Sequence, residues 1–213
     1  ADLITIKDPK APISEAYSTL RTNIQFSSFD KKIQTRMITS SGPGEGKSTI
    51  ASNLAEVMAE GGARTIWIDC DQRKLRLHKI FLTSNQIGLS DILAEKVKFE
   101  DAIQDVGIEN FSLLTSGTRP PNPSELLAFK PMQDFVEVLR QEYDCIIIDT
   151  PPVIAVTDAQ LVARYVDGCL LVVAASQAQR EAAIKAKQLL EKVNANILGT
   201  ILNKLEVKEK GYY

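Results

Sequence analysis

The sequence predicts an α/β domain in which a doubly wound, mostly parallel sheet carries helices on both faces. Short apolar runs alternate along the chain with helical patterns, and the apolar runs are nearly continuous rather than alternating with polar residues. Continuous apolar strands are expected where a parallel sheet is covered on both faces. In such sheets ligands bind at the carboxyl ends of the strands, so the functional residues are expected there.

Each element follows from a local pattern. A strand is expected at 36–40, followed by a glycine-rich turn and a helix at 47–58, whose apolar residues recur at helical spacing. Gly61 and Gly62 end that helix, a usual position for glycine. Further strands are expected at 65–69, 111–115, 145–149, 168–173 and 197–203, with crossover helices at roughly 125–140, 157–166 and 178–194.

Composition indicates one ordinary globular domain spanning 1–213. The chain has 213 residues, 44% apolar and 24% charged. Its net charge of −2 creates no field that would attract nucleic acid. It contains no apolar run of the ~18 residues that a membrane helix needs, and its first residues lack the pattern of a signal peptide. We therefore expect a cytoplasmic location.

The three cysteines do not form a disulfide framework or a zinc site in this interpretation. Cys70, Cys145 and Cys169 are an odd number, lie within apolar runs and show no C-x-x-C spacing. We expect them to be reduced thiols of the core.

A phosphate-binding loop is the strongest functional signal. Residues 41–49 read S-G-P-G-E-G-K-S-T and connect an expected strand to an expected helix, the context of a P-loop. Glycines let backbone N–H groups converge on phosphate oxygens, and the helix N-terminus adds a favourable dipole. Lys47 can reach the β- and γ-phosphates and Ser48 can bind Mg²⁺, although Ser41 replaces the first glycine of the standard pattern. The expected nucleotide-binding residues of this loop are Gly42, Pro43, Gly44, Glu45, Gly46, Lys47, Ser48 and Thr49.

Aspartates follow two other expected strands. Asp149 ends an apolar run and precedes T-P-P, where a carboxylate can hold Mg²⁺ directly or through water. Asp69 and Asp71 end the strand after the P-loop helix, and their i, i+2 spacing on an extended backbone points both side chains the same way. Phosphoryl transfer needs one carboxylate near the metal and another to take the acceptor proton. Arg73 is near enough in sequence to hold a carboxylate or a phosphate.

Together these residues resemble the bacterial tyrosine kinases that regulate capsular and extracellular polysaccharide synthesis, which are relatives of the MinD-type ATPases. The resemblance begins at about Ile13 and covers almost the whole chain. It rests on the phosphate loop, on D-x-D-x-R from Asp69, on I-I-I-D-T-P-P and on two final tyrosines. It also includes P-P-N-P-S-E-L-L at 120–127, which a generic nucleotide-binding domain has no reason to contain.

The resemblance implies a P-loop NTPase fold and a protein-tyrosine kinase that uses ATP and Mg²⁺. It implies that Lys47 binds phosphate and that Ser48 and Asp149 organise Mg²⁺. It also implies that Asp69 is the base toward a tyrosine hydroxyl, with Asp71 supporting the metal site.

The resemblance also implies partners. Members form ring-shaped homo-oligomers in which each tail enters a neighbour's site, so Tyr212 and Tyr213, on a flexible tail at 205–213, are the expected autophosphorylation sites. A membrane-embedded activator is expected to hold the kinase at the inner face of the plasma membrane. Other tyrosine-bearing proteins are expected substrates. Asn203 follows the last strand, where related ATPases contact the base, so we expect it to contact adenine.

The N-terminal segment 1–30 is the expected helical oligomerisation segment. The family motif there reads E-x-x-R-x-x-R, of which Glu15 and Arg21 are present while Ser18 replaces the middle arginine. A serine cannot reproduce the forked, charge-assisted hydrogen bonds of arginine. We therefore expect a weakened ring.

Two alternative functions remain open at this point. An ATP-driven dimerisation switch of the MinD or ParA kind would carry a second lysine where this chain has Gly42, and the tyrosine tail also argues against it. A nucleotide-binding regulatory subunit without turnover is disfavoured by the retention of Lys47 and the three aspartates. A phosphotransfer assay separates that reading from a kinase.

Overall fold

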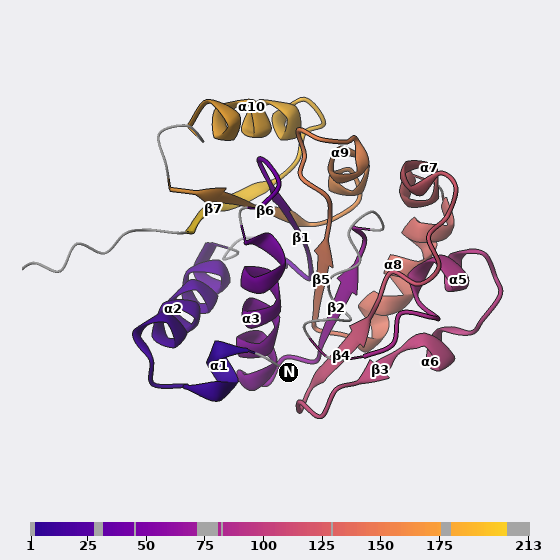
Figure 1. Cartoon of the computed structure of the whole chain (residues 1–213), viewed down its shortest axis with the longest axis horizontal. Coiled ribbons are helices and arrows are strands. Elements are labelled where there is room, and N and C mark those ends of the chain that lie inside the picture. The colour runs from indigo at the N-terminus through magenta and orange to yellow at the C-terminus, as the bar shows by residue number, and fades with distance from the viewer. Residues whose placement is uncertain are drawn as a thin grey trace, which may run out of the picture.

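The computed structural model describes residues 3–27, 32–44, 46–71, 81, 83–128, 130–175 and 180–203 (Figure 1). Within these residues the strands form one seven-stranded sheet with the order β3-β4-β2-β5-β1-β6-β7. All neighbouring strands are parallel except β3, which pairs antiparallel with β4. This is the mostly parallel α/β sheet that the sequence predicts. The strands are β1 (Thr35–Ser40), β2 (Thr65–Asp69), β3 (Gln104–Asp105), β4 (Phe111–Leu114), β5 (Cys145–Asp149), β6 (Gly168–Ala174) and β7 (Ile197–Asn203).

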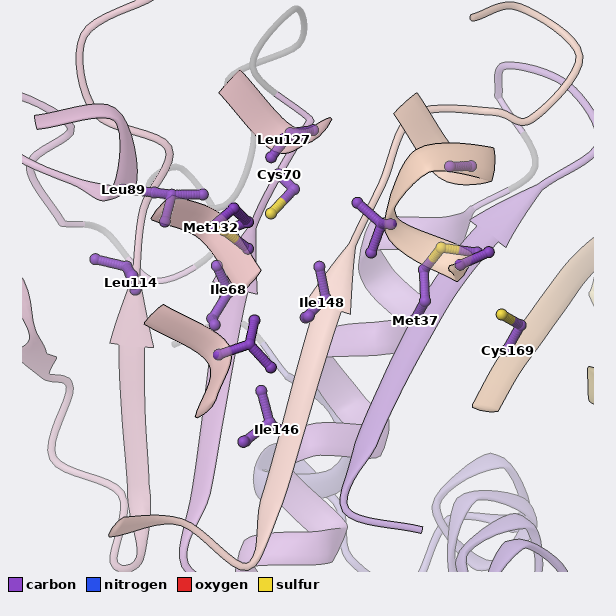
Figure 2. Packing of buried hydrophobic residues seen from close by; sticks show 14 of the residues in the cluster. Met37, Ile68, Cys70, Leu89, Leu114, Leu127, Met132, Ile146, Ile148 and Cys169 are labelled. Atoms are coloured by element: carbon purple, nitrogen blue, oxygen red, sulfur yellow. The ribbon is translucent and has the colours of Figure 1, made fainter. Parts of the chain in front are cut away.

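Helices cover both faces of the sheet. One face packs against α1 (Ile4–Lys7), α2 (Pro12–Ser27) and α3 (Lys47–Glu60). The other face packs against the remaining helices, and Figure 2 shows part of that core. These helices are α5 (Leu89–Leu93), α6 (Phe99–Ala102), α7 (Pro123–Ala128), α8 (Lys130–Glu142), α9 (Asp158–Ala163) and α10 (Arg180–Glu191).

Alternation along the central strands fills both cores. On β2, Trp67 faces α3 while Ile66 and Ile68 belong to the opposite core, and every residue of the strand is buried. The edge strand β7 differs, because most of its residues are only half-buried and Leu202 is 56% exposed. The expectation that its apolar run is buried on both faces is therefore wrong. A strand at the sheet edge has less protein around it than a central one.

The largest departures from the predicted elements lie between β2 and β5. The single helix expected at 125–140 is two helices, α7 and α8. The short elements α5, α6 and β3 were not predicted, because each is too short to show a periodic pattern. Elsewhere the predicted ends shift by a few residues, as is usual at helix and strand termini.

The cysteines behave as the sequence indicates. Cys70, Cys145 and Cys169 are all buried and none is disulfide-bonded. Burial raises the pKa of each thiol, so none is a reactive thiolate.

The helical part of the N-terminal segment packs on α3. Arg21 of α2 donates a hydrogen bond from Nη1 to the carbonyl oxygen of Val57, at 2.7 Å, whereas Glu15 is exposed. Ser18 is half-buried and its hydroxyl donates to the carbonyl of Ser14 at 3.5 Å. The guanidinium expected at a subunit interface thus makes a contact within its own chain. No helix among the described residues is long and apolar enough to cross a membrane.

Candidate active site

The predicted site residues converge because three central strands end together. Asp69 of β2 lies directly opposite Asp149 of β5 in the parallel register. Ile38 of β1 also lies opposite Asp149, two residues before the end of its strand. The loop that follows β1 therefore begins beside both carboxylates. This is the carboxyl edge of the sheet, where ligands bind in folds of this class.

The phosphate loop has the backbone geometry that its glycines predict. Gly44 and Gly46 have φ of 74° and 77°, in the left-handed region that favours glycine. Gly46 precedes the first turn of α3, and its carbonyl accepts a hydrogen bond from the amide of Ile50 at 3.0 Å. The Ser40 hydroxyl donates to the carbonyl of Gly42 at 2.9 Å and braces the start of the loop. Glu45 lies outside the described residues.

Asn203 reaches this loop from the far end of the chain. A Cβ placed on Gly46 would overlap the Asn203 side-chain amide. The last residue of β7 thus lies against the loop, while its contact with adenine stays a prediction. This approach is a second reason for glycine at position 46, beside its positive φ.

Lys47 is surrounded by acidic side chains. Its Nζ forms an ion pair with Oδ1 of Asp149 and lies 4.0 Å from Oδ2 of Asp71. The Ser48 hydroxyl donates to Oδ2 of the same Asp149 carboxylate at 3.2 Å. The structure therefore brings together a lysine, a hydroxyl and two carboxylates from three separate stretches of sequence.

Among Asp69, Asp71 and Asp149, only Asp149 is more deeply buried than Asp69. Its Oδ1 accepts a hydrogen bond from the backbone amide of Asp71 at 2.9 Å, which forms an Asx-type turn at the strand end. The amide of Cys70 donates to the carbonyl of Asp149 at 2.8 Å and fixes the same turn to β5. The turn holds Asp69 and Asp71 next to each other and near Lys47.

Burial and crowding raise the pKa values of the two strand-end carboxyl groups. Asp69 is 2% exposed and Asp149 is 1% exposed. Burial raises the pKa of Asp69 well above its ordinary value, the charge of Asp149 raises it further, and Lys47 opposes both. Burial also raises the pKa of Asp149, against the ion pair with Lys47. One lysine shared among several buried carboxylates cannot favour the ionised form of all of them.

The donor set fits Mg²⁺ that arrives with a nucleotide. The oxygens of Ser48 and Asp149 are hard ligands, and Mg²⁺ is usually bound by one or two carboxylates together with substrate phosphates and water. In the part of the chain that the structure describes, no three His, Cys, Asp or Glu side chains gather closely enough to hold a metal by themselves. This donor set would suit a metal ion that a bound nucleotide also helps to hold.

Three polar contacts support the site and were not predicted. The Thr39 hydroxyl donates to the carbonyl of Pro151 at 2.8 Å, and the Thr150 hydroxyl donates to the carbonyl of Ile38 at 3.0 Å. These bonds connect the ends of β1 and β5. In addition, the Ser124 hydroxyl of α7 donates to the buried Asp158 carboxylate at the start of α9. A single threonine or serine carries no pattern in sequence that reveals such a contact.

The remaining predicted residues are Thr49, Arg73 and the two terminal tyrosines. Thr49 lies in the first turn of α3, directly after Lys47 and Ser48. Arg73, Tyr212 and Tyr213 lie outside the described residues, as does the tail at 205–213.

Comparison with known proteins places these features in a family. The sequence profile described as an AAA domain matches residues 33–207. Tyrosine-protein kinase YwqD of Bacillus subtilis is 42% identical, over 100% of this chain and 91% of the relative. Putative tyrosine-protein kinase CapB of Staphylococcus aureus is 41% identical, over 96% of this chain and 90% of the relative.

Solved structures agree with this grouping. The chimerical protein CapA2B2 superposes with a TM-score of 0.93 at 41% identity, covering 96% of this chain and 90% of that one. The septum site-determining protein MinD of Pyrococcus horikoshii, complexed with Mg-ADP, gives a TM-score of 0.70 at 26% identity, covering 83% of this chain and 72% of that one.

Proposed function

The chain belongs to the bacterial tyrosine-protein kinases of capsular and extracellular polysaccharide systems, and we propose that it transfers the γ-phosphoryl group of Mg²⁺-bound ATP to tyrosines of neighbouring copies of itself and of other proteins. One observation carries the proposal. A buried carboxylate with a raised pKa, Asp69, lies in register with Asp149, which contacts the phosphate-loop residues Lys47 and Ser48.

The nucleotide side of the reaction uses the loop and Asp149. In the structure Lys47 forms an ion pair with Asp149. When Lys47 instead contacts the phosphate oxygens of a bound nucleotide, the Asp149 carboxylate and the Ser48 hydroxyl are able to ligand a metal ion. ATP supplies the phosphoryl group, and Mg²⁺ held by Ser48 and Asp149 would supply positive charge to offset the charge that develops on that group. Asp71, 4.0 Å from Lys47, supports the same cluster. Asn203 contacts the adenine base in this proposal, supported by its position against Gly46.

The acceptor side uses Asp69 as a general base. Asp69 takes the proton of the tyrosine hydroxyl while the phenolic oxygen forms a bond to the γ-phosphorus and the bond from that phosphorus to the leaving oxygen of ADP breaks. A carboxylate with an ordinary pKa is a weak base, and a raised pKa brings it closer to the range in which proton transfer is efficient. General-base help of this kind is typically worth ~10²–10⁴-fold in rate.

The proposed partners follow from the family. A membrane-embedded activator would place the kinase at the inner face of the plasma membrane. The chimerical protein CapA2B2, whose name joins CapA to the kinase CapB, supports an activator of that kind. Tyr212 and Tyr213 are the proposed autophosphorylation sites, with Glu15 and Arg21 contributing to assembly of a ring.

The runner-up function, an ATPase switch of the MinD kind, has weaker support. The chain matches tyrosine kinases over its whole length, with a TM-score of 0.93 to CapA2B2 against 0.70 to MinD. It also has Gly42 where those switches usually carry a second lysine.

The deciding experiment separates transfer between chains from transfer within one chain. An Asp69→Ala chain that keeps its tyrosines is mixed with an active chain lacking residues 212–213, in the presence of ATP and Mg²⁺, with and without an activator peptide. Mass spectrometry should find phosphate on Tyr212 or Tyr213 of the Asp69→Ala chain. A Tyr212→Phe, Tyr213→Phe version of the acceptor is the matched control. Absence of phosphotyrosine from the acceptor would exclude transfer between subunits.

A further inference from the structure

The segment that follows β4 lies next to the proposed base. β4 pairs with β2, so that Leu114 is the strand end beside Ile68 and Asp69. Across the carboxyl edge the order is therefore the phosphate loop after β1, Asp149 on β5, Asp69 on β2 and then the segment 115–122, which begins at the end of β4. In phosphoryl transfer the attacking and leaving oxygens lie roughly in line on opposite sides of the phosphorus. The leaving group belongs to the phosphate loop, so the acceptor approaches from the side of β2 and β4.

The first half of this segment is held firmly by side-chain and backbone bonds. Asn85 donates from its amide to the carbonyl of Gly117 at 3.1 Å and accepts from the amide of Gly117 at 3.0 Å. The amides of Leu89 and Ser90 donate to the carbonyls of Thr115 and Ser116 at 2.9 and 3.0 Å. Residues 115–117 are consequently buried and fixed although they belong to no helix or strand.

Close backbone contact and a buried carboxylate fix the turn that follows. A Cβ on Gly88 would overlap the backbone of Thr115 and Gly117, so the two chain segments touch directly. The buried Asp91 carboxylate accepts hydrogen bonds from the amides of Gly88 and Thr118, at 2.9 and 3.4 Å. These contacts fix the position of Thr118, the first exposed residue of the segment.

The second half of the segment is largely exposed. Thr118, Arg119, Pro121 and Asn122 are exposed. Prolines at 120, 121 and 123 fix φ and restrict the preceding residues to extended conformations, and they offer no N–H groups. At its far end the segment runs into α7, which Ser124 attaches to Asp158. Leu127 of α7 and Cys70, between the two site aspartates, belong to one core cluster at the same end of the sheet (Figure 2).

Arg119 is the cation of the largely exposed residues 118–122. Its guanidinium makes no hydrogen bond or ion pair with any residue that the structure describes. The neighbouring strand end carries Asp69 and Asp71, which repel an acidic peptide. An arginine on the acceptor side offsets that repulsion and can hold a carboxylate with two parallel hydrogen bonds.

We propose that residues 118–122 form the rim that receives the tyrosine-bearing segment and that Arg119 selects acceptor tyrosines with an acidic residue a few positions away. The inference rests on the proposed kinase function and names the substrate class of that site. The chain's own Tyr212 and Tyr213 carry one such residue, Glu209, three and four positions before them, between Lys208 and Lys210.

The test compares two tyrosine peptides that differ only in carrying Glu or Gln beside the tyrosine. With the full chain, Arg119→Ala should raise the KM for the Glu peptide about three- to five-fold, the range of an exposed ion pair. The kcat, the KM for ATP and the KM for the Gln peptide should not change. Arg119→Glu should instead favour a third peptide with Lys at the same position. Arg64→Ala, an exposed arginine at the start of β2 and the opposite end of the sheet, is the matched control.

Two outcomes overturn the proposal. One is an unchanged KM for the Glu peptide in Arg119→Ala, and the other is an equal loss for the Glu and Gln peptides, which would indicate a general structural role. The affinities of both peptides are also measured directly by calorimetry. A chain that binds them with the expected difference but phosphorylates nothing would contradict the kinase function and support the role of Arg119 in binding.

Discussion

The two ends of the central sheet each hold an aspartate beside a cation, yet the pKa values of the two aspartates shift in opposite directions. At the amino end, Asp167 before β6 pairs with Arg140 of α8, from Nη1 to Oδ2 at 2.8 Å and from Nη2 to Oδ1 at 3.1 Å. At the carboxyl end, Asp149 pairs with Lys47. Burial tends to raise both pKa values. The pKa of Asp167 is nevertheless lowered to about 2, whereas that of Asp149 is raised.

The number of donors explains the difference. Asp167 is only partly buried and also accepts hydrogen bonds from the amides of Gln34 and Thr35, at 2.9 and 3.0 Å, so several donors serve one carboxylate. At the other end Lys47 serves Asp149 and Asp71 and lies near Asp69. A satisfied carboxylate stabilises the fold, while crowded and buried ones cost stability and gain basicity. The amino end is thus built for stability and the carboxyl end for chemistry.

The largest expected effect comes from removing the cation of the carboxyl end. Lys47→Met should reduce phosphotransfer by about 10³-fold or more and strongly weaken ATP binding, because the γ-phosphate loses its main counter-charge. Radiolabelled phosphotransfer and nucleotide titration measure the two effects. Lys187→Met, an exposed lysine of α10, is the control and should behave as wild type. Wild-type transfer by the Lys47→Met protein would refute the assignment of the site.

The next effect tests the base. Asp69→Ala should slow transfer by about 10²-fold or more while ATP still binds. A base works only when ionised, so the rate of the wild-type chain should rise with pH through the pKa of Asp69. Because that pKa is raised well above 3.8, the acid limb of kcat/KM should lie above the range of an ordinary aspartate. An unchanged acid limb in Asp69→Ala would assign it to another group, with Asp71 the next candidate.

At the amino end the expected effect is on stability alone. The folded pKa of Asp167, about 2, lies below its value of about 3.9 in an unfolded chain. Its contribution is therefore present above about pH 4 and is lost as the pH falls toward 2. Asp167→Asn should lower the free energy of unfolding at pH 7 by about 1–2 kcal/mol, after allowance for its partial exposure. Urea unfolding at pH 7 and pH 3 should show a smaller difference at the lower pH.

The same variant separates the two ends functionally. At temperatures where it is folded, Asp167→Asn should phosphorylate tyrosine at the wild-type rate. A kinase defect in the folded variant would show that the two ends of the sheet are coupled. The amino end would then not contribute to stability alone.

The smallest effect asks whether a raised carboxyl pKa by itself marks a reactive site. Burial raises the pKa of Glu56 on α3, with Thr5 and Arg21 opposing and Glu60 reinforcing the shift. Its ionised form therefore costs stability, so Glu56→Gln should stabilise the fold by less than about 1 kcal/mol, with a gain that grows from pH 4 to pH 7. Kinase activity should be unchanged. Thermal unfolding across this pH range measures the gain, and a loss of stability at pH 7 would contradict it.

Local chemistry explains why much of the site was predictable. The phosphate loop is contiguous in sequence, and two of its glycines, Gly44 and Gly46, have the positive φ values that favour this residue. Asp69 and Asp149 end apolar runs that become buried strands, so their place at the sheet edge follows from the fold class. The elements α5, α6 and β3 escaped prediction because they are too short for any period, and tertiary contacts decide their conformation.

The sequence by itself therefore determined the fold class, the P-loop and the identities of the acidic residues, because each depends on neighbouring residues. Only the tertiary structure decided that Lys47 pairs with Asp149, that Asn203 touches Gly46 and that Arg21 binds its own chain. It also decided that β7 lies at an edge and that the segment after β4 begins beside the end of β2. These facts depend on the order in which the strands pair. The apolar pattern of a segment predicts that it forms a strand but does not indicate which other strand lies next to it in the sheet. The opposite pKa shifts of Asp149 and Asp167 have the same origin, since burial and the count of nearby donors exist only once distant segments are packed together.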